Sequence, residues 1–298
     1  MKTKFTLVFL LLMPFFGTKA QKPIIVSEDS IMIGNSQLPG LSVTIPEADY
    51  DRTLKEWVKD LQSGTKSKVV TENNEMSIFG AKIRSVSPST LNVYSKLIKL
   101  DSMVQLFASF ELKKDQYIER SVDEAVFNQA QIYLKDFSKT QYISVVKDQA
   151  DAEEKKLREL QKELSSLENE KSRMQRSIQS DNSSIVSQKE NISLQQNEIA
   201  TVNAALTEQN TLLSTMEAGP AQKEKTEQIK ELEKRKKKAQ RSLESSERKI
   251  GRADADIDRD TGDIPRNERM QEKVREQIAE QEAVYQRFAD KLKTIRSY

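Results

Sequence analysis

The sequence predicts an α+β head, in which one helix packs on an antiparallel sheet, followed by a long antiparallel α-helical coiled-coil hairpin, so that the protein is mainly α overall. Three observations predict this fold class. A seven-residue apolar repeat runs through most of the second half of the chain, and one Gly-Pro pair, Gly219 and Pro220, interrupts it. Beyond the first twenty residues, aromatic side chains occur only between Tyr50 and Tyr142 or after position 284. Such a repeat, with charged and amide residues between its apolar positions, is typical of coiled coils.

Residues 1–20 have the layout of a cleaved secretory signal peptide. Lys2 and Lys4 precede an apolar run from Phe5 to Phe16, and small residues follow up to Ala20. A retained membrane anchor is the alternative, but the run is shorter than the ~20 residues that span a bilayer. The chain has no Cys that could carry a lipoprotein anchor. We therefore expect an exported protein, periplasmic or in the cell envelope or secreted, with no transmembrane segment after cleavage.

Residues 21–119 are predicted to form the small α+β globular domain. Leu54, Trp57, Val58 and Leu61 recur at helical spacing, and Gly64 follows as a stop. Alternating apolar residues predict a hairpin with its turn at residues 100–102. Together with four further strand candidates, this indicates an antiparallel sheet of four to six strands. The candidates are Ile31–Ile33, Leu41–Ile45, Lys68–Val70 and Met76–Ile83.

Residues 120–298 are predicted to form the hairpin. Ser121 and Glu124 have the spacing of a capping box, which predicts a helix start there and a helix that continues into the first arm. The first arm has core position a at Leu157 and every seventh residue to Leu213, and d at Leu160 and every seventh residue to Met216. The second arm has a at Ile229 and every seventh residue to Leu292, and d at Leu232 and every seventh residue to Ile295.

The hairpin turn is predicted at residues 217–221, because Gly followed by Pro ends helices. Folding the chain about Gly219 places large a residues opposite small d residues, for example Ile185 opposite Ala253. It also puts Asp181 and Asp260 in neighbouring core layers, where a buried carboxylate is costly. About sixty residues per arm give a rod of roughly 90 Å. Pro265 lies inside the second arm, and we expect a kink or short break there.

Charge argues against nucleic acid as a partner. The precursor has net charge +2, and removal of Lys2, Lys4 and Lys19 leaves 2 − 3 = −1. One basic run lies about twenty residues from the predicted tip and consists of Lys234, Arg235, Lys237 and Lys238, together with Lys236. The simpler interpretation is a solvated helical face, in which the aliphatic part of the Lys236 side chain packs over a core residue. The functional interpretation is a patch for acidic lipid headgroups, an acidic envelope polymer or an acidic protein.

The chemistry of the chain favours a protein that is not an enzyme. Without His or Cys, the Ser-His-Asp and Cys-His catalytic sites and the usual zinc sites cannot form. Glycosidic cleavage needs only two carboxylates, and the head offers several, among them Asp29 and Asp49, but such residues more often cap helices or line turns. We predict no catalytic residue, no cofactor and no metal site, and a carboxylate-based hydrolase ranks third among the functions considered.

Two resemblances bear on function. Three features of the chain resemble uncharacterised exported coiled-coil proteins of the Bacteroidota type. They are the segment Gly40 to Pro46 ahead of a Trp-bearing helix, the segment Leu106 to Leu112, and the charged C-terminal coil. This resemblance implies no known activity. The layout also resembles Skp-type periplasmic chaperones, which carry helical hairpins on a β body. The leading hypothesis is a non-enzymatic cell-envelope interaction or scaffold protein, whose hairpin contacts a protein partner or self-associates. A Skp-like periplasmic holdase chaperone is the alternative.

Overall fold

The computed structural model of the protein describes residues 24–297, so the predicted signal peptide lies outside the described part. The described chain forms two compact units. One contains the residues up to Ala152 together with those from Gln286 onward, and the other spans Glu153–Tyr285. The first is the α+β head with parts of the two long helices, and the second is the hairpin.

The head contains one antiparallel sheet. Among the residues described, seven strands pair in the order β1-β2-β6-β5-β4-β3, and β7 pairs with β6. They are β1 (Val26–Ile33), β2 (Ser36–Pro46), β3 (Val70–Glu72), β4 (Glu75–Ala81), β5 (Leu91–Leu100), β6 (Met103–Lys113) and β7 (Gln116–Tyr117). The predicted upper limit of six strands is wrong because β7 has only two residues, too few to show an alternating pattern.

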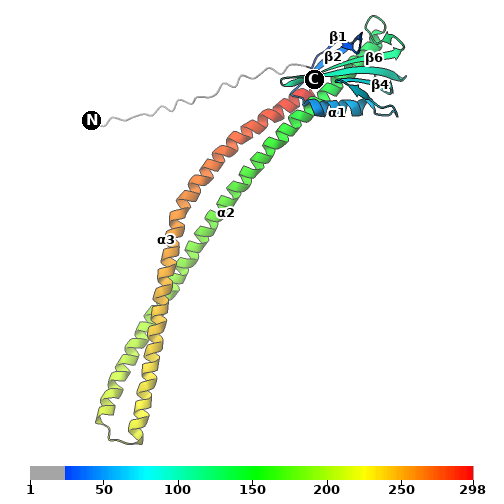
Figure 1. Cartoon of the computed structure of the whole chain (residues 1–298). Coiled ribbons are helices and arrows are strands. Elements are labelled where there is room, and N and C mark those ends of the chain that lie inside the picture. The colour runs from blue at the N-terminus through cyan, green and yellow to red at the C-terminus, as the bar shows by residue number, and fades with distance from the viewer. Residues whose placement is uncertain (1–23, 298) are drawn as a thin grey trace, which may run out of the picture. The chain divides into compact units, whose positions relative to one another are not determined.

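One face of the sheet is covered by helix α1 (Tyr50–Leu61), as Figure 1 shows. The Asp49 carboxylate begins this helix by accepting a hydrogen bond from the backbone N–H of Arg52 at 2.8 Å. Trp57 is fully buried against the sheet, and its indole N–H donates to the Ser95 hydroxyl at 2.9 Å. The single tryptophan of the chain is thus anchored at the centre of the head core.

Helix α2 (Glu124–Thr215) begins on the same face, where Phe127 and Leu134 join the core. The capping box predicted at Ser121 is wrong. The Asp123 carboxylate instead accepts hydrogen bonds from the backbone N–H groups of Ala125 and Val126, at 3.0 and 3.1 Å. Asp and Ser are equally good helix caps, so local spacing does not decide between two adjacent candidates.

The last turns of helix α3 (Pro220–Arg296) belong to the head as well. Ile295 is buried in the head core, and the Lys291 ammonium lies 2.5 Å from Oε1 and 2.7 Å from Oε2 of Glu47. The sequence predicts this return, because folding about Gly219 brings the last aromatic residues back to the start of the first arm.

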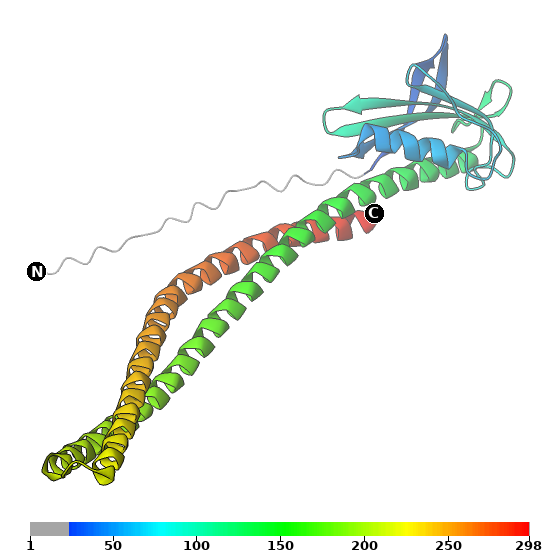
Figure 2. The same ribbon diagram turned by 60° about the horizontal axis from the view of Figure 1, so that its bottom comes forward.

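In the hairpin unit, α2 and α3 run antiparallel side by side (Figures 1 and 2). Every residue predicted at an a or d position of either arm is buried or half-buried, while most other positions of the two arms face solvent. The α+β head followed by a helical hairpin is therefore confirmed. Helix α3 continues through Pro265 without a break, and Figure 2 shows it curving in its orange part, which contains this residue.

Candidate functional site

The tip of the hairpin is short. Helix α2 ends at Thr215 and Pro220 is the first residue of α3, where its missing N–H costs no hydrogen bond. The backbone carbonyl of Gly219 accepts from the N–H of Lys223 at 3.2 Å and so begins the second helix. The space around Gly219 is open, since a Cβ there would meet no atom within 4 Å.

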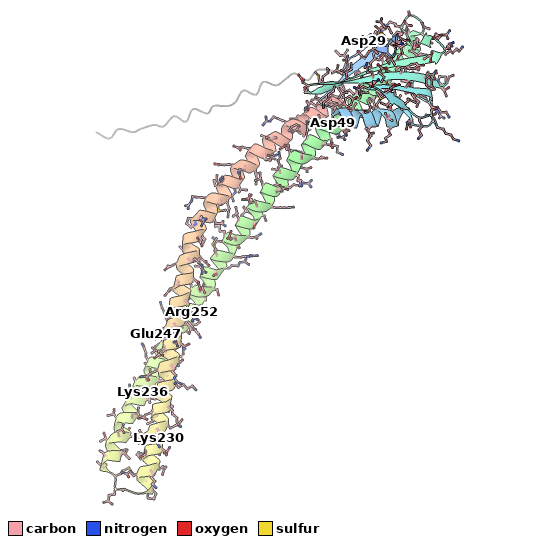
Figure 3. All side chains as sticks on the ribbon, viewed as in Figure 1. Asp29, Asp49, Lys230, Lys236, Glu247 and Arg252 are labelled. Carbon is pink, nitrogen blue, oxygen red and sulfur yellow. The ribbon has the colours of Figure 1, made fainter. Side chains whose placement is uncertain are left out.

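Lys234, Arg235, Lys237 and Lys238 are exposed on α3, and they flank in sequence the half-buried Lys236, which Figure 3 labels. Arg235 pairs across the hairpin with Glu198 at 2.7 Å, and Lys234 pairs with Glu231 at 3.2 Å on its own helix. Lys237 and Lys238 have no ion pair with any residue that the structure describes. Since exposed pairs contribute only about 0–1 kcal/mol, all four cations remain available to an anionic partner.

Lys236 lies between these cations at an a position. It is half-buried, and Val202, its predicted neighbour across the seam, is almost fully buried. This burial agrees with the interpretation that the Lys236 stem covers the seam while the ammonium stays in water.

The two arms carry opposite charge at the same level of the hairpin. Residues 186–215 of α2 contain one Lys and three Glu, so their net charge is 1 − 3 = −2. Residues 223–252 of α3, which lie opposite, contain twelve Lys or Arg and six Glu, which gives 12 − 6 = +6. Lys230, Lys236 and Arg252 mark this basic arm in Figure 3. No single sequence window shows the contrast, because it appears only when the arms are aligned.

Large apolar side chains are exposed on the acidic arm. Val186 is 57% exposed, Leu194 65% and Leu212 45%, and none of them occupies an a or d position. The heptad pattern does not identify these residues, because it locates only the a and d positions of the seam. On a helix whose other outward residues are mostly Ser, Thr, Asn and Glu, they are the natural points of contact for another surface.

The two predicted polar layers differ in burial. Asp260 is only 8% exposed, and its nearest cation is the neighbouring Arg259 at 3.4 Å. Asp181 is half-buried and accepts a long hydrogen bond from Ser177 at 3.4 Å. Neither carboxylate has an ion pair across the seam with any described residue, so these layers add little to the stability of the hairpin.

Two hydrogen-bonded networks cross the seam on either side of those layers. In one, the Asn191 amide donates to the Ser246 hydroxyl at 2.8 Å. In the other, the Asn267 amide donates to Glu170 at 3.0 Å and accepts from Gln271 at 2.7 Å. Buried polar side chains of this kind fix the register of coiled coils at a cost in stability. The sequence places Ser246 and Asn267 in the d row and Gln271 in the a row, and Asn191 lies outside both rows, but it does not show how these side chains pair.

Two carboxylates of the head have structural contacts. Asp49 caps α1, and Glu28 pairs with Arg120 at 2.7 Å. Figure 3 shows Asp29 and Asp49 far apart on the head, so these two do not form a glycosidase-type pair. Among residues 24–297, no group of three or more potential ligands is arranged to hold a metal ion.

Two glutamates on the outer face of the sheet are held ionised. A hydrogen bond from the backbone N–H of Gly34 and another from Lys96 lower the pKa of Glu75. Burial would raise the pKa of Glu111, but hydrogen bonds from Asn92 and the backbone of Asp115 outweigh it and lower that pKa. Glu75 links the turn between β1 and β2 to β5, and Glu111 links β6 to its neighbour β5, so both contacts are structural.

Comparisons with known proteins assign no family to this chain. No family model matches the chain, and no curated protein matches its sequence. No helix within residues 24–297 is both long and apolar enough to cross a membrane.

Proposed function

We propose that the protein is an exported, non-enzymatic scaffold of the cell envelope, whose hairpin binds a second copy of itself or a protein partner. The observation that carries this proposal is the opposite charge of the two arms at one level of the hairpin. Export is supported by the signal-like residues 1–20.

A second copy fits the hairpin surface well. When two hairpins lie side by side with their tips at the same level, the acidic arm of each can face the basic arm of the other. Complementary charge of this kind favours one alignment over others. Burial of Leu194 and its apolar neighbours would add about 1.5–3 kcal/mol for each side chain that becomes fully covered.

Site-specific photo-cross-linking tests the proposal. A photoreactive residue at position 194 is expected to give a cross-linked dimer or a cross-linked partner protein. Glu159 is the matched control, because it occupies the same heptad position as Leu194 and is exposed. Sedimentation of the mature chain is measured beside it. Equal cross-linking from both positions, or none from 194, would show that the distal surface of the hairpin is not the contact.

A holdase chaperone is the second candidate, and the same exposed side chains favour it, because unfolded clients bind apolar surface. This function predicts that the mature chain suppresses aggregation of an unfolded outer-membrane protein. It further predicts that replacing Val186, Leu194 and Leu212 by Ser abolishes the suppression. A scaffold that binds only folded partners leaves the aggregation unchanged.

A further inference from the structure

The hairpin has two broad sides, which the heptad positions define. With the seven positions lettered a to g and the seam at a and d, positions e and g flank the seam, and b and c lie beyond them. Glu198 and Arg235 both occupy g positions and pair across the arms at 2.7 Å, whereas Glu168 and Arg275 both occupy e positions and pair at 3.1 Å. Equivalent flanks of α2 and α3 therefore meet. We call the side with positions g and c the g face, and the side with positions e and b the e face.

The charge contrast between the arms lies on the g face. Within residues 186–215 of α2, this face carries Glu198 and Glu208 and no cation, so its net charge is −2. Within residues 223–252 of α3, it carries four cations and two acids, which gives 4 − 2 = +2. The cations are Arg235, Lys238, Lys249 and Arg252, and the acids are Glu224 and Glu231. The e face of the same segments carries +1 on α2 and 3 − 3 = 0 on α3, so its arms do not attract each other.

Most cations of the g face are available to another surface. Lys238, Lys249 and Arg252 are exposed and have no ion pair within the described part of the chain, and only Arg235 pairs across the hairpin. Figure 3 labels Arg252 among the residues of this basic arm. The g face of α3 therefore offers three cations that no acid of the same chain neutralises.

Exposed leucines lie on the same face. Leu194, which is 65% exposed, occupies a c position, and Leu212, which is 45% exposed, occupies a g position. Val186, the remaining exposed large apolar residue of this part of α2, occupies a b position and so belongs to the e face. The g face thus combines apolar side chains with charge of opposite sign on its two arms, which is the composition of a contact surface.

The register of the seam shows what lies level with these residues. Asn191 contacts Ser246 at 2.8 Å, and 191 + 246 = 437. Position 194 of α2 is therefore level with position 437 − 194 = 243 of α3, and position 198 with position 239. Around the first level, the g face of α3 presents the half-buried Ser242 and Ser245, and around the second it presents Lys238. The α3 surface of a second copy at the same height would accept Leu194 between small side chains.

We propose that the g face binds the g face of a second copy about a two-fold axis parallel to the hairpin, so that α2 of each copy lies on α3 of the other. The inference rests on the proposed function, in which the hairpin is a contact surface, and it names the partner and the face. This axis makes all neighbouring helices antiparallel and sets Glu198 of one copy at the level of Lys238 of the other. A two-fold axis across the hairpin would instead set the basic arms against each other.

Engineered cysteines test the geometry, because the chain contains no Cys. Mature chain with Leu194→Cys is mixed with a differently tagged chain that carries Ser245→Cys, so any disulfide between these two positions joins two copies. We expect a mixed dimer on non-reducing electrophoresis after mild oxidation. The matched control is Ser193→Cys mixed with Glu244→Cys, which occupy b positions on the e face at the same level. Because a disulfide needs close side chains, the control should give about fivefold less mixed dimer or none.

Sedimentation equilibrium tests the contributing side chains. Leu194→Ser should raise the dissociation constant of the dimer by at least about tenfold, since each dimer buries two copies of this residue. Val186→Ser, an equally exposed type of change on the e face, should leave it unchanged. Lys238→Gln should weaken the dimer by about threefold at low salt and less at high salt. Lys237→Gln is its control, because Lys237 is exposed at a b position.

The outcomes separate this inference from the proposed function. Equal or stronger cross-linking of the control pair, or equal weakening by Val186→Ser, would overturn the assignment of the g face while a self-associating hairpin remains. A chain that stays monomeric at high concentration, but photo-cross-links another protein from position 194, would overturn the second copy as the partner and support the protein-partner form of the proposed function. Absence of any photo-cross-link from position 194 would reject both.

Discussion

Gly40 is the position at which the smallest substitution should do the most damage to the head. A Cβ built on it would lie 2.5 Å from the backbone oxygen of Ala108 and 2.9 Å from the ring of Phe107. Carbon atoms pack favourably at about 3.5–4.0 Å, so β2 and β6 must separate by about 1 Å to admit one methyl group. The closest atom belongs to the backbone of a central strand and cannot rotate away, unlike a side chain.

We therefore expect Gly40→Ala to destabilise the head by about 3 kcal/mol, at the upper end of the usual cost of overpacking. With a urea dependence of about 1.5–3 kcal/mol per molar, the midpoint should fall by about 1–2 M. Trp57 fluorescence reports this transition, because this residue is buried in the head core. Far-UV circular dichroism, dominated by α2 and α3, reports the hairpin.

Gly251→Ala is the matched control. Gly251 lies in α3, and a Cβ there meets no atom within 4 Å, so Ala should stabilise the hairpin by about 1 kcal/mol through helix propensity alone. The dichroism transition should rise slightly, and the Trp57 transition should stay in place. If Gly40→Ala leaves the Trp57 midpoint unchanged, the close approach of β2 to β6 is not a constraint and the reasoning is wrong.

Three further predictions concern the seam, the acid response and the basic run. Cysteines at positions 185 and 253 of this Cys-free chain should form a disulfide within one chain, and the pair 186 and 253 should not; non-reducing electrophoresis distinguishes the two. The melting temperature of the head should decrease when the pH is lowered below about 4.5. The pKa values of Glu75 and Glu111 are lowered in the folded state, so the unfolded chain takes up protons first and stability is lost as pH falls through the folded pKa. A Trp57 melting temperature equal at pH 7 and pH 3 would contradict this. The mature chain should bind anionic vesicles at low salt and lose this binding at high salt. Replacement of four cations by Gln should abolish the binding at low salt as well. Vesicle co-sedimentation measures binding under each condition. The four are Lys234, Arg235, Lys237 and Lys238.

The hairpin could be predicted from the sequence in detail, because each core position of a coiled coil depends on a local seven-residue rule. The register across the seam follows from one additional fact, the turn at Gly219. The Asn191–Ser246 contact lies only one residue from the pairing that a fold about Gly219 gives. The heptad phase also survives Pro265, as the unbroken helix α3 requires.

The contact between α1 and α2 on the head could not be predicted in this way. Asp60 and Tyr133 are 73 positions apart in sequence, and their contact depends on how α1 and α2 pack on the sheet. Neither residue belongs to a spaced motif, and an Asp in the last turn of a helix resembles any solvated carboxylate. This contact depends on non-local packing, whereas the core positions of the hairpin depend on the local sequence.

The polar seam connects the stability of the hairpin to its use. Long helices in water depend on packing for most of their stability, and here amides, hydroxyls and the Asp260 carboxylate take many of the core positions. The buried oxygen of Gln188 has no hydrogen-bond partner among the described residues, which costs about 1–3 kcal/mol more. The networks at Ser246 and Asn267 fix the register but do not add apolar burial. Packing of a further helix should therefore stabilise this hairpin more than it would stabilise a hairpin with an apolar seam. Burial of the exposed Leu194 side chain would provide apolar contact area that the polar seam does not. Association and folding of the distal arms should therefore strengthen each other.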